Sequence, residues 1–168
     1  YGLQAVLLQF QQAGERTALR AREQLGRWPD GVSEVEAWVD DPGSGESIRL
    51  HVVAIKESDR LVLDFTGTGD QALAPINLRP PFVEGLARNA AIRLTDRHIT
   101  LNWGMTEAVE CRFRPGSLVD PVFPAPVGFY SKTLALVESA IGAVMAKASG
   151  RPALAHIATQ SSIVVGYS

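Results

Sequence analysis

Three short runs with a two-residue hydrophobic period follow one another in the first half of the sequence. They cover residues 33–39, 48–55 and 61–65, and only a turn-rich segment and a short reversal separate them. Such alternation is typical of strands that are covered on one face. Parallel strands need a crossover of a dozen or more residues, which these short turns cannot supply. The pattern therefore predicts an antiparallel meander.

Helical periodicity flanks this meander, with apolar residues every three or four positions in long segments. The predicted segments are helices over residues 2–26, about 79–95 and about 130–149, short strands over Ile99–Leu101 and Ala108–Phe113, and the extended run Pro121–Pro126. We expect an α+β fold, with a mainly antiparallel sheet and covering helices. Residues 1–168 contain no internal domain boundary, interdomain linker or repeat, so they are predicted to form one unit.

Composition narrows the possible classes of protein. Hydrophobic residues make up 46% of the chain and charged residues 20%, which is typical of a globular domain. A net charge of −2 gives no electrostatic footprint for nucleic acid or an anionic membrane, and no apolar run is long enough to span a bilayer. The single cysteine excludes an internal disulfide framework. We expect a cytoplasmic protein without nucleic-acid or membrane partners.

The most informative local feature lies at the end of the third predicted strand. An apolar run reaches a carboxylate and then a turn of hydroxyl residues and glycines. The candidate residues are Asp64, Thr66, Gly67, Thr68 and, shortly afterwards, Asn77. Such a segment is either a functional site or a tight structural turn, since Asp and Thr also hold local backbone groups. The glycine and lysine spacing of a phosphate loop is absent, so nucleotide binding by this segment is not expected.

Other chemically capable residues are scattered. The three histidines, His51, His98 and His156, are far apart and lack the close spacing of a metal-binding helix, so we predict ordinary surface or hydrogen-bonded histidines. Alternation places Cys111 on the face of Val109 and Phe113, which predicts a buried, inert thiol. Two arginines near the second helix could bind a carboxylate, but no role is assigned to them.

Four pieces of the sequence together resemble the hydantoinase B/oxoprolinase family. The family signature Asp-Phe-Ser-Gly-Thr-Ser, with a following Gln and Asn, is similar to the segment from Leu63 to Gln71 and to Asn77. The family's Asn-x-Gly turn is similar to Asn102-Trp103-Gly104. Its Pro-x-Gly-Ser-x-x-Asn-Pro stretch resembles residues 114–121, and residues 2–26 resemble the helix that leads into this region. The pieces agree in order and rough spacing across essentially the whole chain.

The sequence also departs from the family pattern. Thr66 and Gly69 stand where serines are usual, and Asp120 stands where asparagine is common. Residues 78–82 replace the usual Pro-x-x-x-Thr pattern after the asparagine. These departures affect the assignment of the substrate more than they affect the assignment to the family.

The resemblance implies a role in an ATP-dependent enzyme that opens cyclic amides such as hydantoins or 5-oxoproline. It implies a hydantoinase A-type partner subunit or domain that handles ATP and magnesium, and a divalent metal held by residues outside this segment. No catalytic residue, metal ligand or cofactor is expected within the chain. The candidate turn would border the active-site cavity of the parent protein and organise its backbone, and the chain alone would be inactive.

Two alternatives stay open. The parent could be a subunit of an ATP-dependent ketone carboxylase of the acetone or acetophenone type, or the chain could be a non-catalytic assembly module. The apolar residues of Leu3–Phe10 and the strand-like run at Ile163–Val165 are predicted to be covered by other protein. We therefore expect the central portion of a longer, multi-domain hydantoinase B-type subunit.

Overall fold

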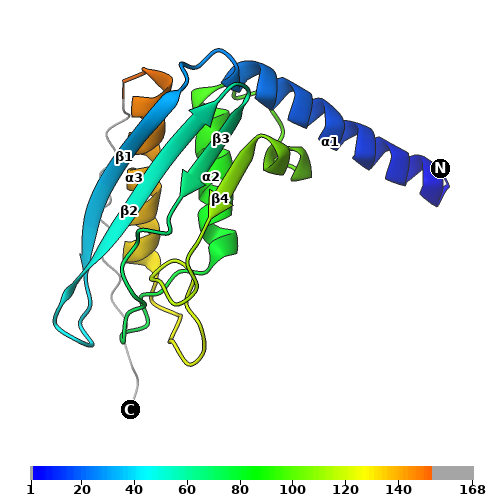
Figure 1. The fold of residues 1–168 in the computed structure, drawn as a ribbon. Coiled ribbons are helices and arrows are strands. Elements are labelled where there is room, and N and C mark those ends of the chain that lie inside the picture. Colours follow the sequence, from blue (N-terminus) through cyan, green and yellow to red (C-terminus); the bar gives the residue numbers. More distant parts are fainter. Residues whose placement is uncertain (1, 153–168) are drawn as a thin grey trace.

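The structure is a computed structural model, and it describes residues 2–152. The described elements, in chain order, are α1 (Leu3–Leu25), β1 (Gly31–Asp40), β2 (Ser47–Glu57), β3 (Arg60–Asp64), α2 (Pro80–Leu94), the 3-10 helix η1 (Trp103–Glu107), β4 (Val109–Arg112) and α3 (Ser131–Ser149). Figure 1 shows the strands in one layer, with α2 and α3 behind them. The histidine at position 156 and the strand-like run at residues 163–165 lie outside the described residues.

The described strands form a four-stranded sheet in the order β1-β2-β3-β4. The first three strands are an antiparallel meander, in which Val35 faces Val52 and Ala54 faces Leu63. β4 pairs with β3 in parallel, after a connection that runs through α2 and η1. The predicted α+β fold with a mainly antiparallel sheet is confirmed. The parallel pair was not predicted, because β4 is short and carries no signal of its pairing partner.

The core lies between the sheet and the helices. Alternate residues of β2 point toward it, so Leu50, Val52 and Ala54 are fully buried while their neighbours are partly exposed. α3 contributes Val137 and Ile141 to the same hydrophobic cluster. Each fully buried large aliphatic side chain contributes about 1.5–3 kcal/mol of transfer free energy. The sheet is therefore fixed against α2 and α3 on one face.

The helix ends follow from local chemistry. α2 begins with two prolines, whose missing N–H groups would have no partner in a first turn. The hydroxyl of Thr95 donates to the carbonyl of Ala91 at 2.6 Å where α2 ends. α3 is followed by Gly150, which adopts a left-handed conformation with φ +66° that favours glycine. The second and third predicted helices are confirmed to within a few residues.

The predicted strand Ile99–Leu101 is wrong. The side chain of Asp96 accepts the N–H of His98 at 2.9 Å, and its carbonyl accepts the N–H of Ile99 at 2.9 Å. These bonds form a turn instead of an extended segment. Asn102 then accepts the N–H of Gly104 at 2.9 Å and begins η1, a 3-10 helix where the sequence predicted a simple turn.

The C-terminal half of α1 packs against η1 at very short range. A Cβ atom added to Gly104 would lie 2.0 Å from the carbonyl oxygen of Gly14, and the indole of Trp103 lies against Gly14. Asn102 donates to the hydroxyl of Thr17 at 3.0 Å. The segment that resembles the family's Asn-x-Gly motif therefore fixes the position of α1 relative to η1.

The N-terminal half of α1 extends away from the sheet (Figure 1). Within the described residues, the side chains of Leu3, Leu7 and Phe10 are strongly exposed. The prediction that other protein covers this segment stays a prediction. No helix within residues 2–152 has both the length and the apolar character needed to cross a membrane.

Candidate functional site

The turn that carries the family signature, residues 64–68, is called the signature turn below. It starts at the end of β3. One carboxylate oxygen of Asp64 accepts the backbone N–H of Thr66 at 2.8 Å and its hydroxyl at 2.6 Å. The N–H of Thr68 donates to the carbonyl of Phe65 at 2.9 Å. Asp64 and Thr66 therefore close a local turn of the kind that aspartate forms with the backbone two residues ahead.

The second half of the turn is fixed to the neighbouring strand β2. The hydroxyl of Thr68 donates to the carbonyl of His51 at 3.1 Å and accepts the N–H of His51 at 3.3 Å. The N–H of Gly69 donates to the carbonyl of Arg49 at 2.8 Å. Thr68 is buried, so its hydroxyl replaces strand-to-strand hydrogen bonds where β3 has ended.

The ring of His51 lies directly beside Gly67. A Cβ atom at position 67 would lie 2.3 Å from Nδ1 of His51, well inside contact distance. Nε2 of the same ring lies 3.3 Å from a carboxylate oxygen of Glu34 on β1. The histidine side chain is 15% exposed and the glutamate 71%. The sequence predicted an ordinary surface or hydrogen-bonded histidine at position 51, and its pattern carried no signal that would place the ring beside the turn.

Asn77 lies in a different environment. Its side chain is fully buried and bonds backbone groups: it accepts the N–H of Ala72 at 2.7 Å and donates to the carbonyls of Ala72 at 3.0 Å and Pro126 at 2.9 Å. It therefore joins the loop after the signature turn to the proline-rich segment. The structure brings Asp64, Thr66, Gly67 and Thr68 into one turn. That this turn borders a substrate cavity stays a prediction.

The stretch that resembles the family's second motif pairs with the signature segment. The N–H of Gln71 donates to the carbonyl of Gly116 at 2.9 Å, and the N–H of Leu118 to that of Gly69 at 3.1 Å. The guanidinium of Arg114 donates to the carbonyl of Thr68 at 2.7 Å. Two motifs that are distant in sequence thus form one hydrogen-bonded unit.

Asp41, the residue directly after β1, holds the same loop from the other side. It is 2% exposed and accepts the N–H groups of Gly43 at 2.9 Å and of Leu73 and Ala74 at 3.0 Å. Burial favours the neutral carboxyl, but these N–H groups and the Ser44 hydroxyl outweigh it and hold the pKa of Asp41 below its usual value. Sequence reasoning missed this residue because it lies in an ordinary turn cluster.

A cavity of about 650 Å³ opens beside these loops. Its lining residues include Val39, Asp41, Ile76, Phe129 and Lys132. This volume is in the range of small-molecule sites. The turn residues at positions 64, 66, 67 and 68 are not among its lining residues. The cavity is therefore a neighbour of the Asp41 loop, not of the signature turn.

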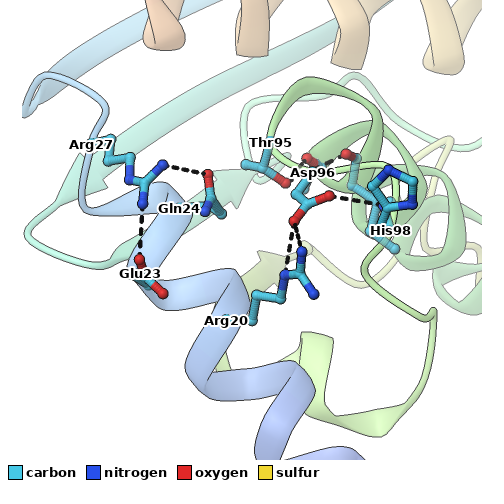
Figure 2. A network of polar contacts seen from close by, with 9 residues as sticks. Arg20, Glu23, Gln24, Arg27, Thr95, Asp96 and His98 are labelled. Atoms are coloured by element: carbon cyan, nitrogen blue, oxygen red, sulfur yellow. Dashed lines mark hydrogen bonds and ion pairs between the residues drawn. The ribbon is translucent and has the colours of Figure 1, made fainter.

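A polar network at the other end of the molecule joins α1 to the turn after α2. Figure 2 shows the guanidinium of Arg20 directed at Asp96. The Nε of Arg20 lies 2.8 Å from the carboxylate, and the N–H of His98, with Arg20, holds the pKa of Asp96 below its usual value against partial burial. The adjacent contacts of Arg27, in the turn after α1, are with Glu23 and Gln24 in the last turn of that helix (Figure 2). This network therefore helps to hold α1 against the turn that follows α2.

The arginines near the second helix do not join the turn. Arg88 pairs with Glu84 one helical turn earlier, at 3.2 Å. Arg79 is the residue before the first turn of α2. Among residues 2–152 no group of three or more His, Cys, Asp or Glu side chains is placed to hold a metal ion. The described residues therefore do not provide a metal site of that kind.

The thiol of Cys111 packs against the hydrophobic core, and burial raises its pKa to about 12. A thiol with that pKa is almost entirely protonated at neutral pH, and the thiolate is the reactive form. We expect iodoacetamide to modify the folded protein at pH 7.5 at least about ten-fold more slowly than the urea-unfolded protein, as measured by intact mass. Cys111 is partly buried instead of fully buried as predicted, and equal rates would contradict an inert thiol.

Comparison with known proteins places these features in a family. The hydantoinase B/oxoprolinase family matches residues 1–167. A protein of Pseudomonas sp. (strain NS671), named as the B-type subunit of a D-/L-hydantoinase, is 28% identical, with 75% of this chain and 23% of that protein covered.

Two solved structures share the fold. The ATP-dependent caprolactamase of Pseudomonas jessenii matches 89% of this chain and 26% of its own, with a TM-score of 0.78 and 18% identity. A nucleotide-free acetone carboxylase matches 81% of this chain and 20% of its own, with a TM-score of 0.67 and 16% identity. The chain thus spans about a quarter or less of these relatives. Because the family match covers almost every residue, the chain belongs to the hydantoinase B/oxoprolinase family.

Proposed function

We propose that this chain is the central portion of a B-type subunit of an ATP-dependent enzyme that hydrolyses cyclic amides of the hydantoin or 5-oxoproline type. The family match over residues 1–167 carries the proposal, because it includes both motifs of the hydrogen-bonded unit. The name of the Pseudomonas relative and the fold of the caprolactamase support the same chemistry.

In this proposal the chemistry is divided between segments. A hydantoinase A-type subunit or domain binds ATP and magnesium, and residues of the parent outside this chain bind a divalent metal. The whole assembly is a cytoplasmic hetero-oligomer. The described residues hold the signature turn: Asp64 closes it, Thr68 attaches it to β2, and Arg114 attaches it to the second motif. No proton transfer is assigned to them.

A ketone carboxylase subunit is the second candidate, and the fold shared with acetone carboxylase favours it. Both reactions activate an unreactive carbonyl compound with the consumption of ATP. A non-catalytic assembly module is the third candidate. The exposed apolar residues in the first part of α1 favour that one, since such surfaces are commonly covered by other protein.

The deciding experiment uses the full-length subunit with its A-type partner. ATP consumption is measured with hydantoin, 5-oxoproline and caprolactam, and separately with acetone and bicarbonate. Turnover of a cyclic amide without bicarbonate supports the proposal, whereas bicarbonate-dependent turnover of the ketone supports the carboxylase. An assembly module would co-purify with partner chains, and changes in its turn would leave turnover intact.

Replacement of Asp64 by alanine tests the role of the turn. The N–H and hydroxyl of Thr66 would lose their shared acceptor, so we expect about 1 kcal/mol less stability and at least about ten-fold lower kcat in the full assembly. D64N, which keeps one acceptor oxygen, should retain more activity than D64A. Unchanged folding and turnover in D64A would refute a role for this turn.

A further inference from the structure

Position 67 is glycine for a steric reason. Its backbone is not among the described positive-φ glycines, so no left-handed conformation requires the absence of a side chain. The nearest atoms to an added Cβ are instead Nδ1 of His51 at 2.3 Å and Cγ and Cε1 of the same ring at 3.3 Å. The imidazole therefore occupies the place that a side chain at position 67 would take.

The ring is held on the strand side as well. Nε2 lies 3.3 Å from Glu34, and the backbone of His51 exchanges hydrogen bonds with the hydroxyl of Thr68. Because β2 alternates, His51 points to the face opposite Leu50 and Val52 and cannot enter the core. The ring is thus placed between the Glu34 carboxylate, which Nε2 contacts, and Gly67, beside which Nδ1 lies.

We propose that His51, supported by Glu34, is the positioning residue that sets the place of the signature turn in the proposed reaction. The inference rests on the proposed function for its activity readout. The flat ring acts as a spacer against Gly67, while Thr68 fixes the distance to β2. Since a displacement of about 1 Å in a reacting site can cost a factor of about 100 in rate, such a spacer would affect kcat.

A double-mutant cycle in the full-length subunit tests this inference. The variants are G67A, H51A and H51A/G67A, and Tm is measured for each. We expect G67A to lower Tm by at least about 2 °C, and the double variant to lie within about 1 °C of H51A, because removal of the ring also removes the clash. If the Tm losses of G67A and H51A add in the double variant, the steric part of the inference is wrong. G85A is the control, since a Cβ there meets nothing within 4 Å.

Activity of the subunit with its partner distinguishes a spacer from a proton carrier. We expect H51A to lower kcat at least about ten-fold with KM changed less than about three-fold. H51F keeps a flat ring but loses the contact of Nε2 with Glu34, so it should recover part of the lost kcat. An H51F variant as inactive as H51A, or an H51A variant with unchanged kcat, would overturn the positioning role. If the wild-type assembly shows no turnover, the proposed function fails, while the Tm cycle still decides the steric part.

Discussion

The Gly104→Ala variant is expected to lose at least about 3 kcal/mol of unfolding free energy, as measured by urea denaturation. An added Cβ would lie 2.0 Å from the carbonyl oxygen of Gly14 and 2.9 Å from the backbone nitrogen of Ala18. Both contacts are with the backbone of α1, so no side-chain rotation can relieve them. The helix must move away from η1, and the bond from Asn102 to Thr17 would break with it.

The opposite side of this contact supplies a matched comparison. In Gly14→Ala the new Cβ would lie 1.9 Å from the indole of Trp103, so this variant should also be destabilised. Gly142→Ala, in the interior of α3, has no atom within 4 Å of the new Cβ and should gain up to about 1 kcal/mol from helix propensity. If Gly104→Ala and Gly142→Ala were equally stable, α1 would not be seated on η1 as described.

Hydrophobic periodicity was sufficient to predict the three long helices and the three strands of the meander, because most of these elements turn one face toward the core. Periodicity could not identify β3 as the parallel partner of β4, because the apolar pattern of Val109–Arg112 does not indicate which strand pairs with it. It also failed at Ile99, where the side chain of Asp96 draws the backbone into a turn. In both places tertiary contacts or turn chemistry outweighed the local apolar pattern.

The candidate turn was located from its residue types, but its construction depends on contacts between distant segments. Gly14, which interrupts the apolar pattern of the first helix, is the place where the indole of Trp103 packs. His51 and Asp41 had no distinguishing pattern of their own, and their importance comes from what β1, β2 and the loops place beside them. A single sequence shows where a glycine stands, but it does not show the neighbouring ring or carbonyl that leaves no room for a side chain there.

Replacement of Asp41 is expected to have an effect of similar size, with a dependence on pH. Asp41→Ala would leave the N–H groups of Gly43, Leu73 and Ala74 without their acceptor, which should cost roughly 2–4 kcal/mol. Asp40→Ala is the matched control. Asp40 is the adjacent, exposed carboxylate and accepts the hydroxyl of Ser47, so its replacement should cost less than about 1 kcal/mol.

The pH dependence of the unfolding free energy distinguishes the effect of the Asp41 charge from the effect of its side-chain shape. Because its pKa is lower in the folded than in the unfolded chain, the ionised carboxylate stabilises the fold above about pH 4, and this contribution is lost as the pH falls through the folded pKa. Urea unfolding between about pH 7 and pH 2.5 should therefore show a smaller acid-induced loss in Asp41→Asn than in the wild type. Some loss should remain, since the pKa values of Asp30 and Asp96 are also lowered. A wild-type acid response that Asp41→Asn leaves unchanged would mean that the carboxylate charge does not stabilise this loop.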